Sequence, residues 1–174
     1  DIVNIMQPQV KEKSQYFDIF IRPMISEEVY CDAVRLNQVL LNLLSNAVKF
    51  TPENGRIDIH MMQEPSKLGE EYVCTYITVV DTGIGMSEEF QKKIFDTFSR
   101  EETDQVRQTV GTGLGMAITK SIVTMMGGTI QVESEHGKGT SFHVSLDLKK
   151  AAMHEEDMKL PEWNILVVDD NEML

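Results

Sequence analysis

Two asparagines and a lysine recur at helical spacing within the segment 36–50. Asn42, Asn46 and Lys49 fall on one stripe of a helix, turned about 100° from the apolar face that a core would bury. An amide oxygen, a second amide and a cation along one helix edge suit a metal-bound polyphosphate. The alternative is an ordinary polar helix surface. The remaining motifs of the chain decide between these two interpretations.

A carboxylate and two glycines follow the apolar run 77–80. Asp81 stands where the predicted strand ends, and Gly83 and Gly85 come directly after it. A carboxylate in this position can accept a hydrogen bond from an exocyclic amine, and the glycines would let a ligand approach the backbone. A simple turn is the alternative, because Asp and Gly are common turn residues.

Two further glycine clusters occur later in the chain. The first, Gly111-Thr112-Gly113-Leu114-Gly115, precedes a predicted helix, so its backbone N–H groups could cradle phosphates. It is not a Walker A loop, and it could equally serve as the hinge of a lid. The second, Gly137-Lys138-Gly139-Thr140, precedes a strand, and a plain hairpin turn is its alternative interpretation.

The elements that must position these residues follow from periodicity and turn signals. We predict helices over 2–14, from a cap at Asp32 to Phe50, over 88–95 after a cap at Ser87, and from the second glycine cluster to Gly127. We predict strands over 16–22, 56–63, 72–81, 129–134 and 140–148. These elements indicate an α+β two-layer sandwich, with one mixed β-sheet and helices on one of its faces.

Composition bounds the possible functions. The 174 residues suffice for one domain with a sizeable core, and the net charge of −12 argues against nucleic-acid binding. No apolar run approaches the roughly 20 residues that a membrane span needs. Cys31 and Cys74 are isolated, so we expect reduced, partly buried thiols in a cytoplasmic protein. Because the chain begins at Asp1 without Met, we expect it to be part of a longer protein.

The order of the motifs resembles that of the catalytic ATP-binding domain of sensor histidine kinases, within the GHKL (Bergerat-fold) ATPase superfamily. The resemblance covers about residues 1–150. The matching motifs are the N box (Asn42 to Lys49), the first glycine box (Asp81 to Gly85), the F box (Phe95 to Phe98), the second glycine box (Gly111 to Gly115) and the third (Gly137 to Thr140). Any one of these could occur by chance, but all five in order identify the family.

The resemblance implies a site for ATP or ADP with Mg²⁺. Asn46 resembles the metal ligand, Asn42 and Lys49 resemble phosphate contacts, and Arg100 resembles a lid cation that reaches the γ-phosphate. Phe50 resembles the aromatic residue near the adenine. Asp81 resembles the carboxylate that binds the adenine amino group, with Thr140 nearby through a shared water. The nucleotide-binding set also includes Gly83, Gly85, Gly111, Thr112, Gly113, Leu114 and Gly115, and the lid would span about 96–112.

One position argues for a kinase rather than a hydrolase. The water-using ATPases of the superfamily resemble one another in a Glu four residues before the metal-binding Asn, and that position here is Asn42. A neutral amide cannot act as a general base at neutral pH. We therefore expect ATP to serve as phosphoryl donor to a histidine on a separate dimerisation domain. A nucleotide-binding regulatory module without transfer, or an ATP-hydrolysing machine, are the alternatives.

The end of the chain resembles the start of a response-regulator receiver domain. The run 163–170 is apolar and ends in Asp169 and Asp170, which match that family's paired acids, and 151–162 reads as a linker. The resemblance implies a hybrid histidine kinase, with 163–174 as a truncated receiver domain fused downstream. We expect the fragment to be monomeric and the full-length protein to be a homodimer. A membrane anchor in that protein remains open.

Overall fold

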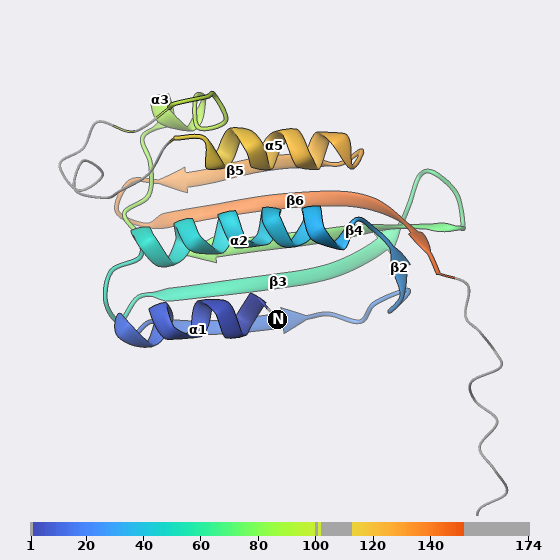
Figure 1. Ribbon diagram of the computed structural model, residues 1–174, viewed down its shortest axis with the longest axis horizontal. Helices are drawn as coiled ribbons and strands as arrows, with labels where there is room; N and C mark the ends of the chain where they lie inside the picture. The colour runs from blue at the N-terminus through green and yellow to red at the C-terminus, as the bar shows by residue number, and fades with distance from the viewer. Residues whose placement is uncertain (1, 100, 102–112, 152–174) are drawn as a thin grey trace, which may run out of the picture.

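In the residues that the structure describes, six strands form one mixed sheet and the helices α1, α2 and α5 lie on one face of it (Figure 1). The computed structural model describes residues 2–99, 101 and 113–151. The elements are α1 (Ile2–Glu12), β1 (Tyr16–Ile21), β2 (Val29–Tyr30), α2 (Ala33–Phe50), β3 (Arg56–Pro65), β4 (Tyr72–Asp81), α3 (Glu88–Gln91), α5 (Gly115–Met125), β5 (Thr129–Glu135) and β6 (Gly139–Lys150). This arrangement confirms the predicted α+β two-layer sandwich.

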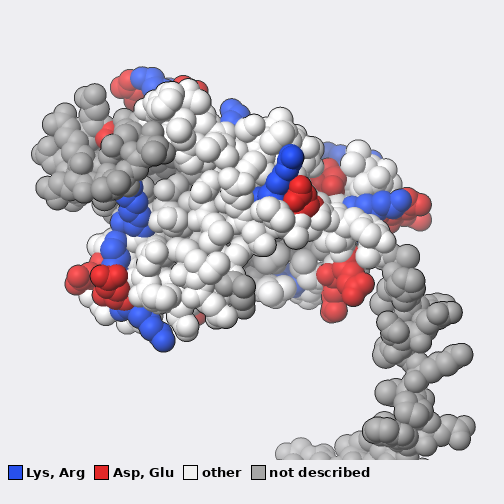
Figure 2. Space-filling view, viewed as in Figure 1, with Lys and Arg blue, Asp and Glu red and all other residues white. Residues whose placement is uncertain are grey.

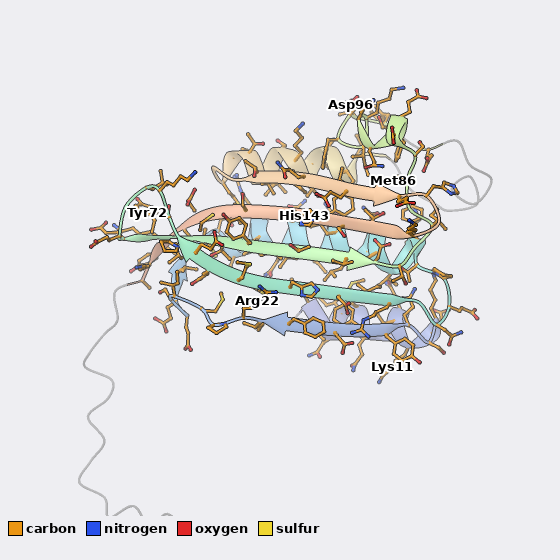
Figure 3. The ribbon with its side chains drawn as sticks, turned by 180° about the vertical axis from the view of Figure 1, so that it is seen from behind. Lys11, Arg22, Tyr72, Met86, Asp96 and His143 are labelled. Atoms are coloured by element: carbon orange, nitrogen blue, oxygen red, sulfur yellow. The ribbon has the colours of Figure 1, made fainter. Side chains whose placement is uncertain are left out.

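The sheet has a core-facing side and an open side. Its strand order is β1-β3-β4-β6-β2, with β5 paired to β6, and β1 runs parallel to β3 while the other pairs are antiparallel. Buried and half-buried positions alternate along β4, because successive side chains point to opposite faces. Seen from behind, the sheet lies in front of the helices, and polar side chains such as His143 lie on its open face (Figure 3).

Helix α2 occupies the middle of the helical layer. The Asp32 carboxylate accepts a hydrogen bond from the Arg35 N–H at 3.1 Å, which confirms the predicted cap. The apolar stripe of the helix is buried against the sheet, and Val39 and Leu43 are completely inaccessible to solvent. The side of the molecule that carries the helices bears few charged side chains in its middle (Figure 2).

Three local predictions were wrong. The helix predicted over 88–95 ends at Gln91, because Lys93 N–H bonds to Phe90 O and Asp96 N–H to Lys93 O, a spacing of three residues that tightens the chain into turns. Strand β2 was missed, since its two residues are too few to show alternation. Cys31 is exposed rather than partly buried, whereas Cys74 is half-buried as expected.

The C-terminal end of α2 is capped by side chains from the connection between α1 and β1. The Lys13 ammonium donates to the carbonyls of Val48 and Lys49, both at 2.9 Å, and to that of Thr51 at 3.1 Å. Gln15 Nε2 donates to the Thr51 carbonyl at 2.7 Å. A cation and an amide thus satisfy carbonyls that the helix leaves unpaired, at the negative end of its dipole.

The end of β4 and the β5–β6 hairpin approach each other so closely that side chains cannot fit between them. A Cβ atom on Gly139, whose φ is +118°, would lie 1.9 Å from the Asp81 carbonyl oxygen. A Cβ atom on Gly85, whose φ is +65°, would lie 2.0 Å from the Glu135 carbonyl oxygen. The expectation that Gly83 and Gly85 serve the approach of a ligand is therefore incomplete, because protein backbone already fills the space beside Gly85, as it does beside Gly139.

We predict that Lys13→Met lowers the free energy of unfolding by about 1–2 kcal/mol, because carbonyls at the end of α2 lose a cationic donor. Chemical denaturation measures the change. Lys11→Met is the matched control, since Lys11 is exposed and lies on α1 only two residues away. Equal stability of the two variants would show that the cap contributes nothing.

We predict that Gly139→Ala destabilises the domain by about 3 kcal/mol more than Gly137→Ala does, or prevents folding. Both glycines have positive φ, but a Cβ on Gly137 meets nothing within 4 Å, so this control isolates the close approach to Asp81. Thermal and chemical denaturation of both variants would provide the comparison. A similar loss in both would mean that the backbone conformation alone requires glycine at position 139.

Candidate functional site

A pocket of about 310 Å³ opens where α2 ends and α5 begins. Its lining comes from separate parts of the chain: the last turns of α2, the end of β4 with the turn after it, the segment 86–101, the start of α5 and the start of β6. The lining residues are Ser45, Asn46, Lys49, Phe50, Asp81, Ile84, Gly85, Met86, Phe90, Ile94, Ser99, Glu101, Gly113, Gly115, Met116, Thr140 and Phe142. Of the five motifs within residues 1–150, all except the F box contribute residues to this list.

Asp81 is the buried acid of the pocket, with 7% of its surface exposed. Its Oδ1 accepts a hydrogen bond from the Gly83 N–H at 2.8 Å. Burial raises the pKa of Asp81 to about 6, while the backbone N–H groups of Gly83 and Thr140 oppose the shift by stabilising the charged form. At neutral pH the carboxylate is therefore mostly ionised, and it offers the pocket a strong hydrogen-bond acceptor.

The last turns of α2 supply an amide, a cation and an aromatic ring to one wall. Asn46 Nδ2 lies 3.2 Å from the Met116 sulfur, so the side chain spans from α2 toward α5. Lys49 Nζ lies 4.9 Å from the centre of the Phe50 ring, a cation–π distance. Because Lys13 and Gln15 cap this end of the helix, the wall is held in place by residues that the sequence did not single out.

Asn42 lies on the predicted stripe but does not line the pocket. Its Nδ2 lies 3.2 Å from Thr119 Oγ1 and 3.4 Å from the Gly115 carbonyl, and Thr119 Oγ1 donates to that same carbonyl at 2.9 Å. Helix α5 packs on this part of the stripe, and its residues accept hydrogen bonds from the Asn42 amide. A contact between Asn42 and phosphate therefore remains a prediction.

Apolar side chains form most of the lining that the sequence did not predict. They are Ile84, Met86, Phe90, Ile94, Met116 and Phe142. Phe142 could have been found, because it stands two residues after Thr140 on a strand and so shares its face. The others carried no signal beyond being apolar. Such a surface beside a few placed polar groups is typical of a site for a flat organic ring.

Besides Asn42, five predicted site residues lie outside the lining or outside the described chain. Gly83 donates to Asp81 but does not line the pocket, and Leu114 precedes the first turn of α5 without lining it. Arg100, Gly111 and Thr112 lie outside the described residues. In the F box, Phe98 is 73% exposed, and its N–H donates to the Gly113 carbonyl at 3.0 Å.

The oxygen donors of the pocket agree with a magnesium ion that is held mainly by the phosphate oxygens of a bound polyphosphate. Asn46 can offer one neutral amide oxygen from the wall. Within the described residues, no group of three or more His, Cys, Asp or Glu side chains could hold a metal. Mg²⁺ is commonly bound through one or two protein groups, with waters and phosphate oxygens completing its octahedron.

The described helices include none that is both long and apolar enough to cross a bilayer.

Comparison with known proteins agrees with this geometry. Residues 31–150 match the family model described as histidine kinase-, DNA gyrase B-, and HSP90-like ATPase. The autoinducer 2 sensor kinase/phosphatase LuxQ of Vibrio vulnificus (strain YJ016) is 37% identical over 97% of this chain and 20% of its own length. The aerobic respiration control sensor protein ArcB of Escherichia coli (strain K12) is 31% identical over 99% of this chain and 22% of its own length.

Solved structures share the fold. Full-length ShkA in complex with AMPPNP has a TM-score of 0.68 and 31% identity, over 87% of this chain and 29% of that chain. The catalytic domain of histidine kinase ThkA has a TM-score of 0.67 and 26% identity, over 86% of this chain and 90% of that chain. The chain spans about a fifth of the length of the curated relatives given above. It belongs to the family of histidine kinase-, DNA gyrase B- and HSP90-like ATPases, on the sensor histidine kinase branch.

Proposed function

We propose that this domain binds Mg·ATP and donates the γ-phosphate to a histidine on a separate dimerisation domain. The observation that carries the proposal is the shared pocket, in which a buried Asp81 carboxylate faces the same space as the Asn46 amide and the Lys49 cation. An acceptor for a base amine and a cation for phosphate suit the two ends of one nucleotide. The ShkA complex with AMPPNP, an ATP analogue, supports this assignment.

The adenine end is assigned to Asp81, Thr140 and the apolar lining. The ionised Asp81 accepts from the exocyclic amine, and Thr140, its register partner across β4 and β6, lies beside it. Phe50 and the apolar side chains around it exclude water from the faces of the ring. Gly85 contributes backbone to this part of the lining, where a larger residue would strike the Glu135 carbonyl.

The phosphate end is assigned to Asn46, Lys49 and the start of α5. Gly113 and Gly115 line the pocket two residues before and at the first residue of this 11-residue helix. Free N–H groups and the positive end of the dipole at this point favour an anion. Asn46 would hold Mg²⁺, which offsets negative charge on the polyphosphate when bound. Asn42, Arg100, Gly111, Thr112 and Leu114 complete the proposed set.

The choice of transfer over hydrolysis follows from the side chains near the phosphate end. Asn42 is an amide, engaged with Thr119, and cannot take a proton from water. Glu101 also lines the pocket, but its Oε1 accepts the Ser87 N–H at 2.9 Å, which ties this carboxylate to the start of α3. A regulatory module that binds ATP without transfer has the same described pocket, so experiment must separate the two.

The partners extend beyond this chain. We infer that residues 1–150 form the ATP-binding domain, that 151–162 link it onward and that 163–174 begin a receiver domain. A histidine-bearing domain of the same protein would be the phosphoryl acceptor, in a full-length homodimer, with the fragment itself monomeric and cytoplasmic. The names of the two relatives given above, a sensor kinase/phosphatase and a sensor protein, support the place of this domain in a larger sensor protein.

We predict that γ-labelled ATP transfers its label to a histidine-bearing dimerisation domain supplied with this chain. Transfer should follow from positioning and charge neutralisation, without a base for water. Acid-labile, alkali-stable label on the acceptor is the readout, and the acceptor with its histidine replaced by Gln is the control. ATP binding with no label transferred would favour the regulatory module. Steady phosphate release by the chain alone would favour the hydrolase.

We predict that ATP affinity depends on pH through Asp81. As the pH falls below about 6, the carboxylate gains a proton and can no longer accept fully from the base amine. Affinity should then fall by up to about tenfold per pH unit. Calorimetry between pH 5 and pH 7.5 measures the ATP affinity. The Asp81→Asn variant is the control, because protonation of the nucleotide itself affects both proteins equally. Parallel profiles for both proteins would remove Asp81 from adenine recognition.

A further inference from the structure

We propose that Ser134, which does not line the pocket, selects adenine over 6-oxo purines by fixing the direction of the Thr140 hydroxyl proton. The inference rests on the proposed nucleotide site and deepens it, because it assigns a residue to base specificity. Ser134 lies on β5 as the register partner of Thr140 on β6. It is thus one strand further from Asp81, which pairs with Thr140 from the other side.

The Ser134 hydroxyl has three partners. Its Oγ donates to the Gly139 carbonyl at 2.8 Å, accepts the Met86 N–H at 2.9 Å and lies 3.0 Å from Thr140 Oγ1. A hydroxyl has one proton and two lone pairs. The Gly139 carbonyl can only accept, so it takes the proton of Ser134, and the Met86 N–H occupies one lone pair. The remaining lone pair is filled when Thr140 donates its proton to Ser134.

This assignment decides what Thr140 offers a ligand. Its single proton is committed to Ser134, so its oxygen presents only lone pairs to the pocket. The neighbouring Asp81 carboxylate is also an acceptor at neutral pH. The base edge therefore meets two adjacent acceptors, which suit the 6-amino group of adenine or a water that it orders. The 6-oxo group of hypoxanthine or guanine would bring a third acceptor to the same place, and no proton would lie between them.

The position of Ser134 is itself fixed by α3. Gln91 Nε2 donates to the Ser134 carbonyl at 2.8 Å, and Gln91 Oε1 accepts the Ser134 N–H at 3.2 Å. The side-chain amide of Gln91 thus binds both the N–H and the carbonyl of Ser134 on the outer side of β5. Ser134 is a positioning residue that acts on the base through Thr140.

The experiment compares ATP with ITP, which carries a 6-oxo group in place of the amine. Dissociation constants of both nucleotides are measured by calorimetry with Mg²⁺ at pH 7.5, where Asp81 is ionised, for the wild type, Ser134→Ala and Ser134→Cys. Without a firm acceptor at position 134, the Thr140 hydroxyl can turn and donate to the 6-oxo group. We expect the preference for ATP over ITP to fall by about fivefold or more in both variants.

A second background isolates the hydroxyl pair. In Thr140→Val the threonine proton is absent, so a further Ser134→Ala change should leave the ATP-to-ITP ratio unaltered. Ser134→Thr keeps a hydroxyl at this position and should keep the wild-type preference for ATP over ITP. Ser134→Cys keeps the shape of the side chain, so it provides the test if Ser134→Ala does not fold.

The outcomes separate this inference from the proposed function. An equal loss of affinity for both nucleotides in the Ser134 variants would show a purely structural role and overturn the inference, with the ATP site intact. A change in the ratio that persists in the Thr140→Val background would also overturn it. Failure of the wild type to bind either nucleotide would instead overturn the proposed function.

Discussion

The pocket depends on the contact between the Asp81 carbonyl oxygen and the α-carbon of Gly139. A Cβ atom placed there would be 1.9 Å from the oxygen, so the end of β4 and the hairpin meet without side chains between them. This contact keeps Thr140 beside Asp81 and lets two backbone N–H groups offset part of the cost of burying a carboxylate. The acid is thus held in place before any ligand arrives, which lowers the cost of ordering it upon binding.

The opposite wall is fixed by a different kind of interaction. Helix α2 presents Asn46, Lys49 and Phe50 from its last turns, where a helix would otherwise fray with unpaired carbonyls. Lys13 and Gln15 occupy those carbonyls from the connection between α1 and β1. The pocket therefore has one wall held by close backbone packing and another held by a side-chain cap, and each is formed by segments far apart in the sequence.

Much of this structure could be predicted from local patterns. Periodicity predicted α2 and the long strands, and helical spacing placed Asn46 and Lys49 on one stripe of α2. The family resemblance, rather than spacing, implied that Asp81 and Thr140 lie near the same ligand. The role of Lys13 could not be predicted, because its partners lie 35 or more residues away. Likewise, nothing local shows that α5 takes up the Asn42 amide, or that Gly85 and Gly139 face protein backbone. These features depend on how elements pack, which a single sequence does not display.

The surroundings of Asn42 constrain how this scaffold can evolve. Its amide nitrogen faces the Gly115 carbonyl and a Thr119 hydroxyl whose proton is already given to that carbonyl. A glutamate in the same place would set a negative charge beside the Gly115 carbonyl, and the Thr119 hydroxyl would have to turn away from that carbonyl to donate to the carboxylate. A descendant that acquired a water-activating carboxylate at position 42 would therefore lose the amide's hydrogen bonds to α5 and would have to rearrange the hydroxyl at position 119. Positions 42 and 119 should covary across the branches of the family that differ in chemistry.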